Sequence, residues 1–237
     1  MGGSAEADSG ESENIVDEFV GTDGTPHEPT SDAEIDRIRK SAWFVHGNYY
    51  QIAKLGPSVP GDGMARFDVN NGNGGFKEYQ KKGEVLRCIH NYVASLYSYN
   101  LQVLEHINEK THNRQYNKGD LLPGRDTPDR EIPEYIKSYT FLHGLRNDIQ
   151  HGEYHCLSVN KVDEDEDGRE YYQAKFTKHG FEPRPVGGLD RSGDYLRHSD
   201  QKDRQYLLTY ICEFHDLFND FETDIETWCE RSRTDSL

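Results

Sequence analysis

Apolar residues recur at every third or fourth position over long parts of this chain, and that spacing restricts it to helices with one buried face. The most regular part runs from about Asp200 to Arg231. Its apolar positions are Leu207, Ile211, Phe214, Phe218, Phe221, Ile225 and Trp228. A regular seam over three heptads is typical of a long helix in a bundle, or of a helix at a dimer seam. We expect the bundle.

Two further helices of the same kind are expected in the first half of the chain. The first begins at the capping-box pattern Ser31–Glu34 and ends near Gly56-Pro57. The second covers about Tyr79–Lys110, where Asn100 breaks the apolar stripe. Between them, the Gly/Asn-rich run Asn70–Gly75 lacks the Gly-Lys-Ser/Thr ending and the preceding strand of a phosphate-binding loop. We interpret this run as a connector.

A third helix begins after Pro133, and beyond it the apolar spacing changes to alternation. Residues from about 154 to 178 therefore predict a β-hairpin, with the acidic run Asp163–Gly168 as its turn. That run also matches the start of a calcium-binding loop, but its twelfth position, which should be a bidentate Glu, is Ala174. We favour the hairpin turn. A Gly/Pro-containing loop over about 181–200 follows the hairpin.

These patterns together predict an all-α fold. We expect a helical bundle of four to five helices, with the small β-hairpin inserted between the third helix and the last. Residues 31–237 are of ordinary size for one domain.

The chain is acidic, with 27 Lys and Arg against 43 Asp and Glu and a formal charge of −16. Eleven of the acids precede Arg37, the first basic residue. Such a one-sign segment cannot bury enough apolar surface to offset chain entropy, so residues 1–30 are expected to form a disordered acidic tail. Asp slightly exceeds Glu and Arg exceeds Lys, which suggests a halophilic proteome. The tail then serves solubility, with a partner-binding arm as the alternative.

The sequence indicates a soluble, cytoplasmic protein. No stretch approaches the roughly 18 apolar residues of a membrane span, and the N-terminus lacks the basic and apolar regions of a signal peptide. The cysteines lie far apart without a Cys-x-x-Cys pair, so we interpret them as reduced core thiols. They are Cys88, Cys156, Cys212 and Cys229.

Charged and polar residues gather at the expected end of the third helix, in the segment Leu145–Gly152. At about 100° per residue, Asn147 and His151 share a face, whereas Arg146 is offset from His151 by about 140°. One copy of the helix therefore aims both side chains at one point only if the helix end unwinds. A second copy of the chain would also bring them together.

The run Arg146-Asn147-Asp148-Ile149-Gln150-His151 resembles the signature of the HEPN superfamily of helical domains. That signature is an Arg and, after four to six residues, a His, commonly with Asn, Asp or His directly after the Arg. The helical layout over Ser31–Arg231 is compatible with the bundle of that family.

The resemblance implies a homodimer with facing motif helices and, in active members, an endoribonuclease that needs neither metal nor cofactor. Attack by the RNA 2′-hydroxyl would leave a 2′,3′-cyclic phosphate. In this reading His151 is the acid/base, Arg146 contacts the phosphate, and Asn147 orients the phosphate or the His. The expected partner is RNA rather than DNA, in a toxin or defence role that can include an antitoxin.

The same residues also allow structural readings. Arg146 could pair with an acid such as Asp148 or Asp120, and His151 could interact with the helix-end carbonyls. Many domains with this fold serve as dimerising or RNA-binding modules without catalysis, and this is the alternative function.

Two further alternatives concern the neighbouring residues. His143, His151 and His155 could form a metal site if the helix continued, but Gly152 argues that it stops. Some toxin members carry a modifiable Tyr two residues after the His, whereas here Tyr154 is at the third position.

The sequence contains few clustered basic residues that could bind RNA. The richest stretch lies in the loop before the last helix and contributes Arg184, Arg191 and Arg197, which we expect to bind substrate. A solvated connector is the simpler interpretation of the same loop.

Overall fold

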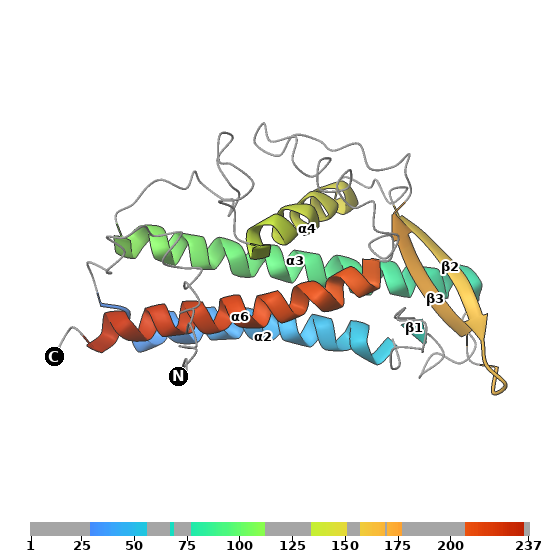
Figure 1. Cartoon of the computed structure of the whole chain (residues 1–237), viewed down its shortest axis with the longest axis horizontal. Coiled ribbons are helices and arrows are strands. Elements are labelled where there is room, and N and C mark those ends of the chain that lie inside the picture. Colours follow the sequence, from blue (N-terminus) through green and yellow to red (C-terminus); the bar gives the residue numbers. More distant parts are fainter. Residues whose placement is uncertain are drawn as a thin grey trace, which may run out of the picture.

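The computed structural model of the chain describes residues 29–55, 67–68, 77–111, 134–150, 157–168, 170–176 and 207–234. These ranges contain four helices and three strands, and the expected all-α fold is confirmed. The helices are α2 (Asp32–Leu55), α3 (Glu78–Thr111), α4 (Glu134–Gln150) and α6 (Leu207–Thr234). The strands are β1 (Phe67–Asp68), β2 (Leu157–Glu164) and β3 (Glu170–Phe176). Figure 1 shows α2, α3 and α6 side by side along the long axis, with α4 against α3 and the sheet at one end.

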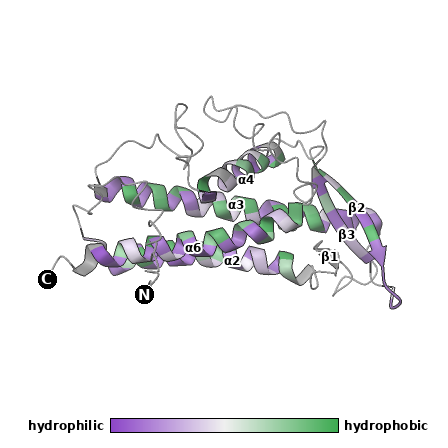
Figure 2. Cartoon of the chain, in the orientation of Figure 1, coloured by the Kyte–Doolittle hydropathy of each residue, from purple (hydrophilic) through white to green (hydrophobic). Residues whose placement is uncertain are grey.

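The predicted seam of α6 forms the centre of the core. All seven of its apolar positions are buried, from Leu207 to Trp228, and they pack against the buried faces of α2, α3 and α4. Figure 2 shows hydrophobic and hydrophilic residues alternating along each helix, as amphipathic packing requires. Each large apolar side chain buried in this way contributes about 1.5 to 3 kcal/mol.

The capping box at the start of α2 is confirmed. The Ser31 backbone N–H donates to Glu34 Oε2 at 2.7 Å, and the Glu34 N–H donates to Ser31 Oγ at 3.4 Å. These reciprocal bonds satisfy two backbone donors that a helix start otherwise leaves open. The helix ends at Leu55, directly before the predicted stop.

The hairpin is also confirmed, and a short third strand joins it. β2 and β3 pair antiparallel from Leu157 opposite Phe176 to Glu164 opposite Glu170. β1 pairs with the other edge of β3, although its surroundings were expected to form only a connector. Two residues without a flanking alternation carry too little signal to predict a strand.

The acidic run closes the hairpin as a turn. Gly168 has φ +75°, and its N–H donates to the Asp165 carbonyl at 3.0 Å. The Asp165 carboxylate accepts bonds from the Asp167 N–H and the Tyr171 hydroxyl. Among the described residues, the carboxylates of this turn form no group with metal-ligand spacing. The hairpin interpretation accounts for the acidic run.

Buried polar bonds fix α4 on its neighbours. Asn100, the break in the α3 stripe, is buried and accepts a hydrogen bond from the Tyr135 hydroxyl of α4 at 2.9 Å. The Tyr210 hydroxyl of α6 donates to the Ser138 carbonyl of α4 at 2.9 Å. Because such bonds require one relative placement of the helices, they set where the end of α4 lies.

Most of the expected acidic tail, residues 1–28, lies outside the described residues. The next two residues contact α3: the Pro29 carbonyl accepts a bond from Lys110 Nζ at 3.1 Å, and Thr30 is buried. In the described part of the chain, no helix combines the length and apolar character needed to cross a bilayer.

The described cysteines have free thiols, as expected. Burial raises the pKa of Cys88 to about 11 and that of Cys229 to about 12, so both stay protonated and unreactive at neutral pH. Cys212 is half-buried, and Cys156 lies outside the described residues.

Candidate functional site

The motif lies at the end of α4, as the sequence predicts. Arg146 and Asn147 lie near the end of the helix, which ends at Gln150. His151 follows directly and lies outside the described residues. The structure therefore brings Arg146 and Asn147 together.

A tyrosine of α3 supports the arginine. The Arg146 guanidinium carbon lies 4.0 Å from the centre of the Tyr97 ring, in cation–π geometry. Arg146 Nη1 donates to Asn147 Oδ1 at 2.8 Å. We call Arg146, Asn147 and Tyr97 the arginine site.

The hydrogen-bonding groups of the arginine site are mostly donors. Among the side chains that the structure describes, which do not include those of Asp148 and Asp120, no carboxylate pairs with Arg146, and its buried Nε has no hydrogen-bond partner. Because Asn147 Oδ1 accepts from the arginine, the Asn147 amide NH₂ is left to donate elsewhere. A half-buried cation beside an amide donor suits an oxyanion such as a phosphate.

His143 lies one turn before Arg146 and belongs to the core. It is 3% exposed, and its ring centre is 5.4 Å from that of Tyr97 and 5.8 Å from that of Tyr139. His151 and His155, the other members of the three-His metal alternative, lie outside the described residues.

The remaining predicted site residues lie outside the described residues. They are Arg184, Arg191 and Arg197, and Tyr154 lies outside as well. Tyr97 is the member of the site that sequence reasoning missed. It stands beside the apolar stripe of α3, and nothing in the spacing distinguishes it from other surface tyrosines.

A second polar cluster crosses α3, α6 and α2, and the sequence analysis did not single it out. The Tyr92 hydroxyl lies 3.3 Å from His215 Nδ1, and His215 Nε2 lies 3.2 Å from His46 Nδ1. His46 Nε2 lies 2.6 Å from Glu222 Oε2. We call these four residues the core polar chain. His215 is a buried polar residue directly beside the apolar seam of α6, next to Phe214, and a polar residue in that place is the signal that could have found it.

One arrangement of protons satisfies the whole core polar chain. The Tyr92 hydroxyl donates to His215 Nδ1, His215 Nε2 donates to His46 Nδ1, and His46 Nε2 donates to the Glu222 carboxylate. Tyr49 stacks on His215 with 3.7 Å between ring centres. Burial, with a smaller contribution from His46, lowers the pKa of His215 to about 4, so this imidazole is neutral at pH 7.

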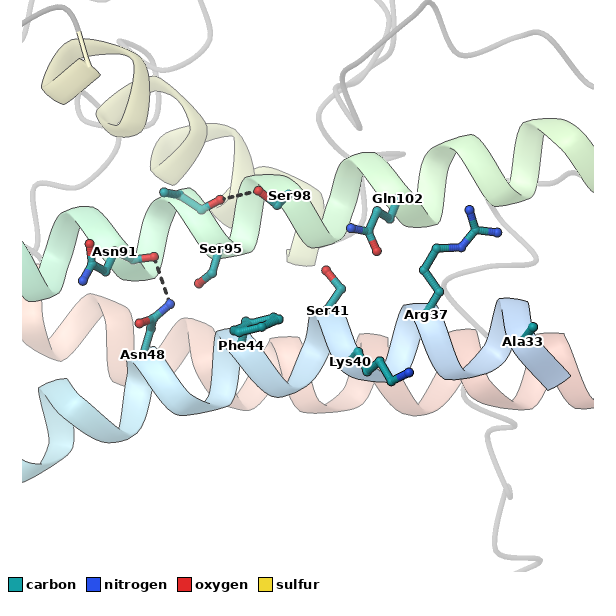
Figure 3. A pocket seen from close by; sticks show the side chains of 11 residues that line it. Ala33, Arg37, Lys40, Ser41, Phe44, Asn48, Asn91, Ser95, Ser98 and Gln102 are labelled. Carbon is teal, nitrogen blue, oxygen red and sulfur yellow. Dashed lines mark hydrogen bonds between the residues drawn. The ribbon is translucent and has the colours of Figure 1, made fainter.

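A surface groove of about 580 Å³ runs between α2 and α3 (Figure 3). Most of the residues that line it are polar, and Asn48 spans it to donate to the Asn91 carbonyl at 3.2 Å. Arg37 and Lys40 are its cations, and Phe44 lies exposed on its wall. Among the described residues, the lining contains no carboxylate or imidazole, so this part of the groove offers no acid–base pair.

No family model, curated protein or solved structure matches this chain. The resemblance to HEPN domains therefore depends on the motif and the helical layout.

Proposed function

We propose that this chain is an endoribonuclease of HEPN type, with a toxin or defence role, that cleaves RNA without a metal ion. The arginine site is the observation that carries the proposal. Arg146 is half-buried and fixed by the Tyr97 ring and the Asn147 amide oxygen, without a carboxylate partner among the described side chains. A cation held in this way is free to stabilise the charge that grows on a phosphate in the transition state.

In the proposed reaction, the RNA 2′-hydroxyl loses a proton and attacks the adjacent phosphorus. The bond to the 5′-oxygen breaks, that oxygen gains a proton, and a 2′,3′-cyclic phosphate remains. His151 is assigned the proton transfers, because an imidazole with a pKa near 6.5 both accepts and donates protons at neutral pH. Arg146 holds the non-bridging oxygens, and Asn147 orients the phosphate through its NH₂ group.

The proposal includes a homodimer. Arg146 and His151 are about 140° apart around one ideal helix, so a second copy of the chain is the simplest way to bring them to one phosphate. The two Arg146–His151 segments would then border a common cleft. Light scattering at micromolar concentration and high salt is expected to give twice the chain mass, and a monomer would contradict the dimer.

RNA contacts are assigned to Arg184, Arg191 and Arg197. We expect the protein in the cytoplasm, with an antitoxin or another neutralising protein as its partner. Because the whole chain carries −16, nonspecific attraction to RNA is unfavourable, and a structured or ribosome-bound RNA is the expected substrate.

Cleavage of cellular RNA in EDTA tests the proposed chemistry. The purified chain should cleave, leave cyclic-phosphate ends, and fail on RNA whose 2′-hydroxyls are methylated, because that hydroxyl is the nucleophile. His151→Ala should lower the rate at least about a hundredfold with little change in folding. Cleavage of 2′-O-methyl RNA would overturn the mechanism, and absence of cleavage of any cellular RNA would favour the silent-module alternative.

Mixing two inactive variants tests whether each site draws on both chains. Arg146→Ala and His151→Ala homodimers are each expected to be inactive. If Arg146 of one chain serves His151 of the other, mixed dimers contain one intact site and regain activity. A mixture that exchanges subunits and stays inactive would place both residues of each site on one chain.

A further inference from the structure

Three metal-ligating side chains meet where α2 begins and α3 ends. Glu34 lies in the first turn of α2, and His106 and Glu109 are three residues apart near the end of α3. One donor atom of each lies within 4.8 Å of the other two. We propose that Glu34, His106 and Glu109 bind one divalent transition-metal ion, with Zn²⁺ as the best-fitting ion. We call these residues the carboxylate–histidine group.

His106 gives the observation that points to a ligand. Its side chain is 5% exposed, and its Nδ1 is buried without a hydrogen-bond partner among the described residues. A buried polar atom left in this way costs about 1 to 3 kcal/mol. The other ring nitrogen, Nε2, lies 3.3 Å from Thr30 Oγ1. If Nε2 carries the proton and donates to Thr30, the lone pair stands on Nδ1, which is how a second shell prepares a metal-bound histidine.

The group borders a space of suitable size. A small cavity of about 30 Å³ is lined by all three members, together with Glu105, Arg37 and other residues. Donors that share one zinc ion lie about 3 to 4 Å apart, because each bond is about 2 Å long. Small side-chain rotations from the present spacing are therefore sufficient. The buried Trp228 ring packs perpendicular to the His106 ring, with 5.9 Å between the ring centres.

The cations near the group leave room for the ion. Lys110 Nζ lies 3.0 Å from Glu34 Oε1, and Ser31 bonds Oε2 through its N–H and its hydroxyl. These contacts use three of the roughly four acceptor positions of a carboxylate, which leaves one for a metal. Glu109 is exposed, and no cation of the described residues forms an ion pair with it. Three carboxylates, those of Glu34, Glu105 and Glu109, lie near this cavity together with two cations, Arg37 and Lys110. The net charge of these five groups is therefore negative before the ion binds.

The donor set favours a transition metal over calcium or magnesium. An imidazole nitrogen beside two carboxylates suits Zn²⁺ and its neighbours, whereas Ca²⁺ and Mg²⁺ prefer oxygen ligands alone. Tyr97 and His106 are nine residues apart on α3, about 14 Å along the helix. The ion would join the start of α2 to the end of α3, away from the arginine site, and the inference does not depend on the proposed function.

Titration of the full chain with metal tests this inference. After removal of bound metal with chelator, calorimetry with Zn²⁺ should show one high-affinity site per chain, with a melting temperature that rises until one equivalent is bound. Ca²⁺ should bind at least about a hundredfold more weakly, because calcium ligands are oxygens. If Zn²⁺ does not bind the wild-type chain at micromolar concentration, the proposal is wrong.

Three variants locate the site. Glu109→Gln changes an exposed side chain, so it should fold normally while weakening Zn²⁺ at least about tenfold, and His106→Gln should weaken it further. Glu105→Gln removes the same charge from the same cavity wall without removing a ligand, and it should bind nearly as the wild type does. Zn²⁺ binding that survives both Glu109→Gln and His106→Gln would place the ion elsewhere and overturn the proposal.

Substitution of Co²⁺ for Zn²⁺ gives a readout that a structural role alone would not produce. The wild-type chain should show visible cobalt absorption and a shift of the His106 Nδ1 resonance on loading. Neither signal should appear in Glu109→Gln at the concentration that saturates the wild type. If both signals persist unchanged in this variant, Glu109 is not a ligand and the three-residue site is wrong.

Discussion

The arginine site and the core polar chain lie on the same bundle and differ in how completely their polar atoms are paired. In the core polar chain, from Tyr92 to Glu222, one proton arrangement gives every ring nitrogen a partner. In the arginine site, Arg146 Nε is buried without a hydrogen-bond partner among the described side chains, and no carboxylate among them pairs with this cation.

This difference is the one expected between a stabilising network and the binding site that we propose. A fully paired buried network rigidifies the helices that contribute to it, and breaking it leaves unpaired polar atoms in the core. A cation with unused donors gains most when an external anion arrives. We therefore expect substitutions in the core polar chain to change the free energy of unfolding, and substitutions in the arginine site to change the rate of RNA cleavage.

The largest change is expected for His215→Ala. This substitution removes the ring that Tyr49 stacks on and leaves the Tyr92 hydroxyl and a nitrogen of His46 without their partner. A loss of about 2 to 4 kcal/mol in the free energy of unfolding is expected from denaturant melts. His90→Ala, a half-buried histidine of α3, is the control and should cost clearly less. Equal losses would show that the chain of hydrogen bonds is not what stabilises the core.

The next change compares two buried tyrosines. Tyr135→Phe leaves buried Asn100 Oδ1 without its donor and should cost about 1 to 2 kcal/mol. Tyr99→Phe should be neutral or slightly stabilising, because the buried Tyr99 hydroxyl has no hydrogen-bond partner among the described residues. Chemical denaturation of both variants measures the difference, and a larger loss in Tyr99→Phe would contradict the pairing described above.

The pH dependence of stability is a further test of the core polar chain. Burial lowers the pKa of His215 from 6.5 to about 4, so the unfolded chain binds the proton more readily than the folded one. The stabilisation is complete above pH 6.5 and is lost as the pH falls toward 4. Between pH 6.5 and 5 the free energy of unfolding should fall by an amount on the order of 1 kcal/mol, and His215→Gln should reduce this slope. An unchanged slope in the variant would assign the proton uptake to another group.

The smallest change in stability is expected at the arginine site. Arg146→Ala loses one cation–π contact and one hydrogen bond on a half-buried side chain, so thermal melts should show a loss below about 1 kcal/mol. A loss as large as that of His215→Ala would mean that Arg146 is a core residue and would remove the contrast between the two clusters.

The fold was predictable where the signal is local. The capping box at Ser31 and the seam of α6 each depend on residues a few positions apart, and the structure follows both closely. The strand β1 was not predictable, because its two residues take their conformation from pairing with β3, about a hundred positions later in the chain.

The candidate sites show the same limit. The Arg146–Asn147 pair is visible in the sequence, since the two residues are neighbours at an expected helix end. Its support by Tyr97 comes from another helix, and the contact between His46 and His215 joins positions 169 residues apart. A single sequence does not show which distant residues contact each other, although a polar residue in or beside an apolar seam indicates that it has a polar partner.

The central claim is that the arginine site acts on RNA and the core polar chain does not. The most direct test is the rate of RNA cleavage in chelator by Arg146→Ala and His215→Ala, each normalised to the folded fraction. The claim predicts a loss of at least about a hundredfold for Arg146→Ala, an equally poor Arg146→Lys because an ammonium lacks the planar fork, and a wild-type rate for His215→Ala. A wild-type rate for Arg146→Ala, or a loss confined to His215→Ala, would contradict it.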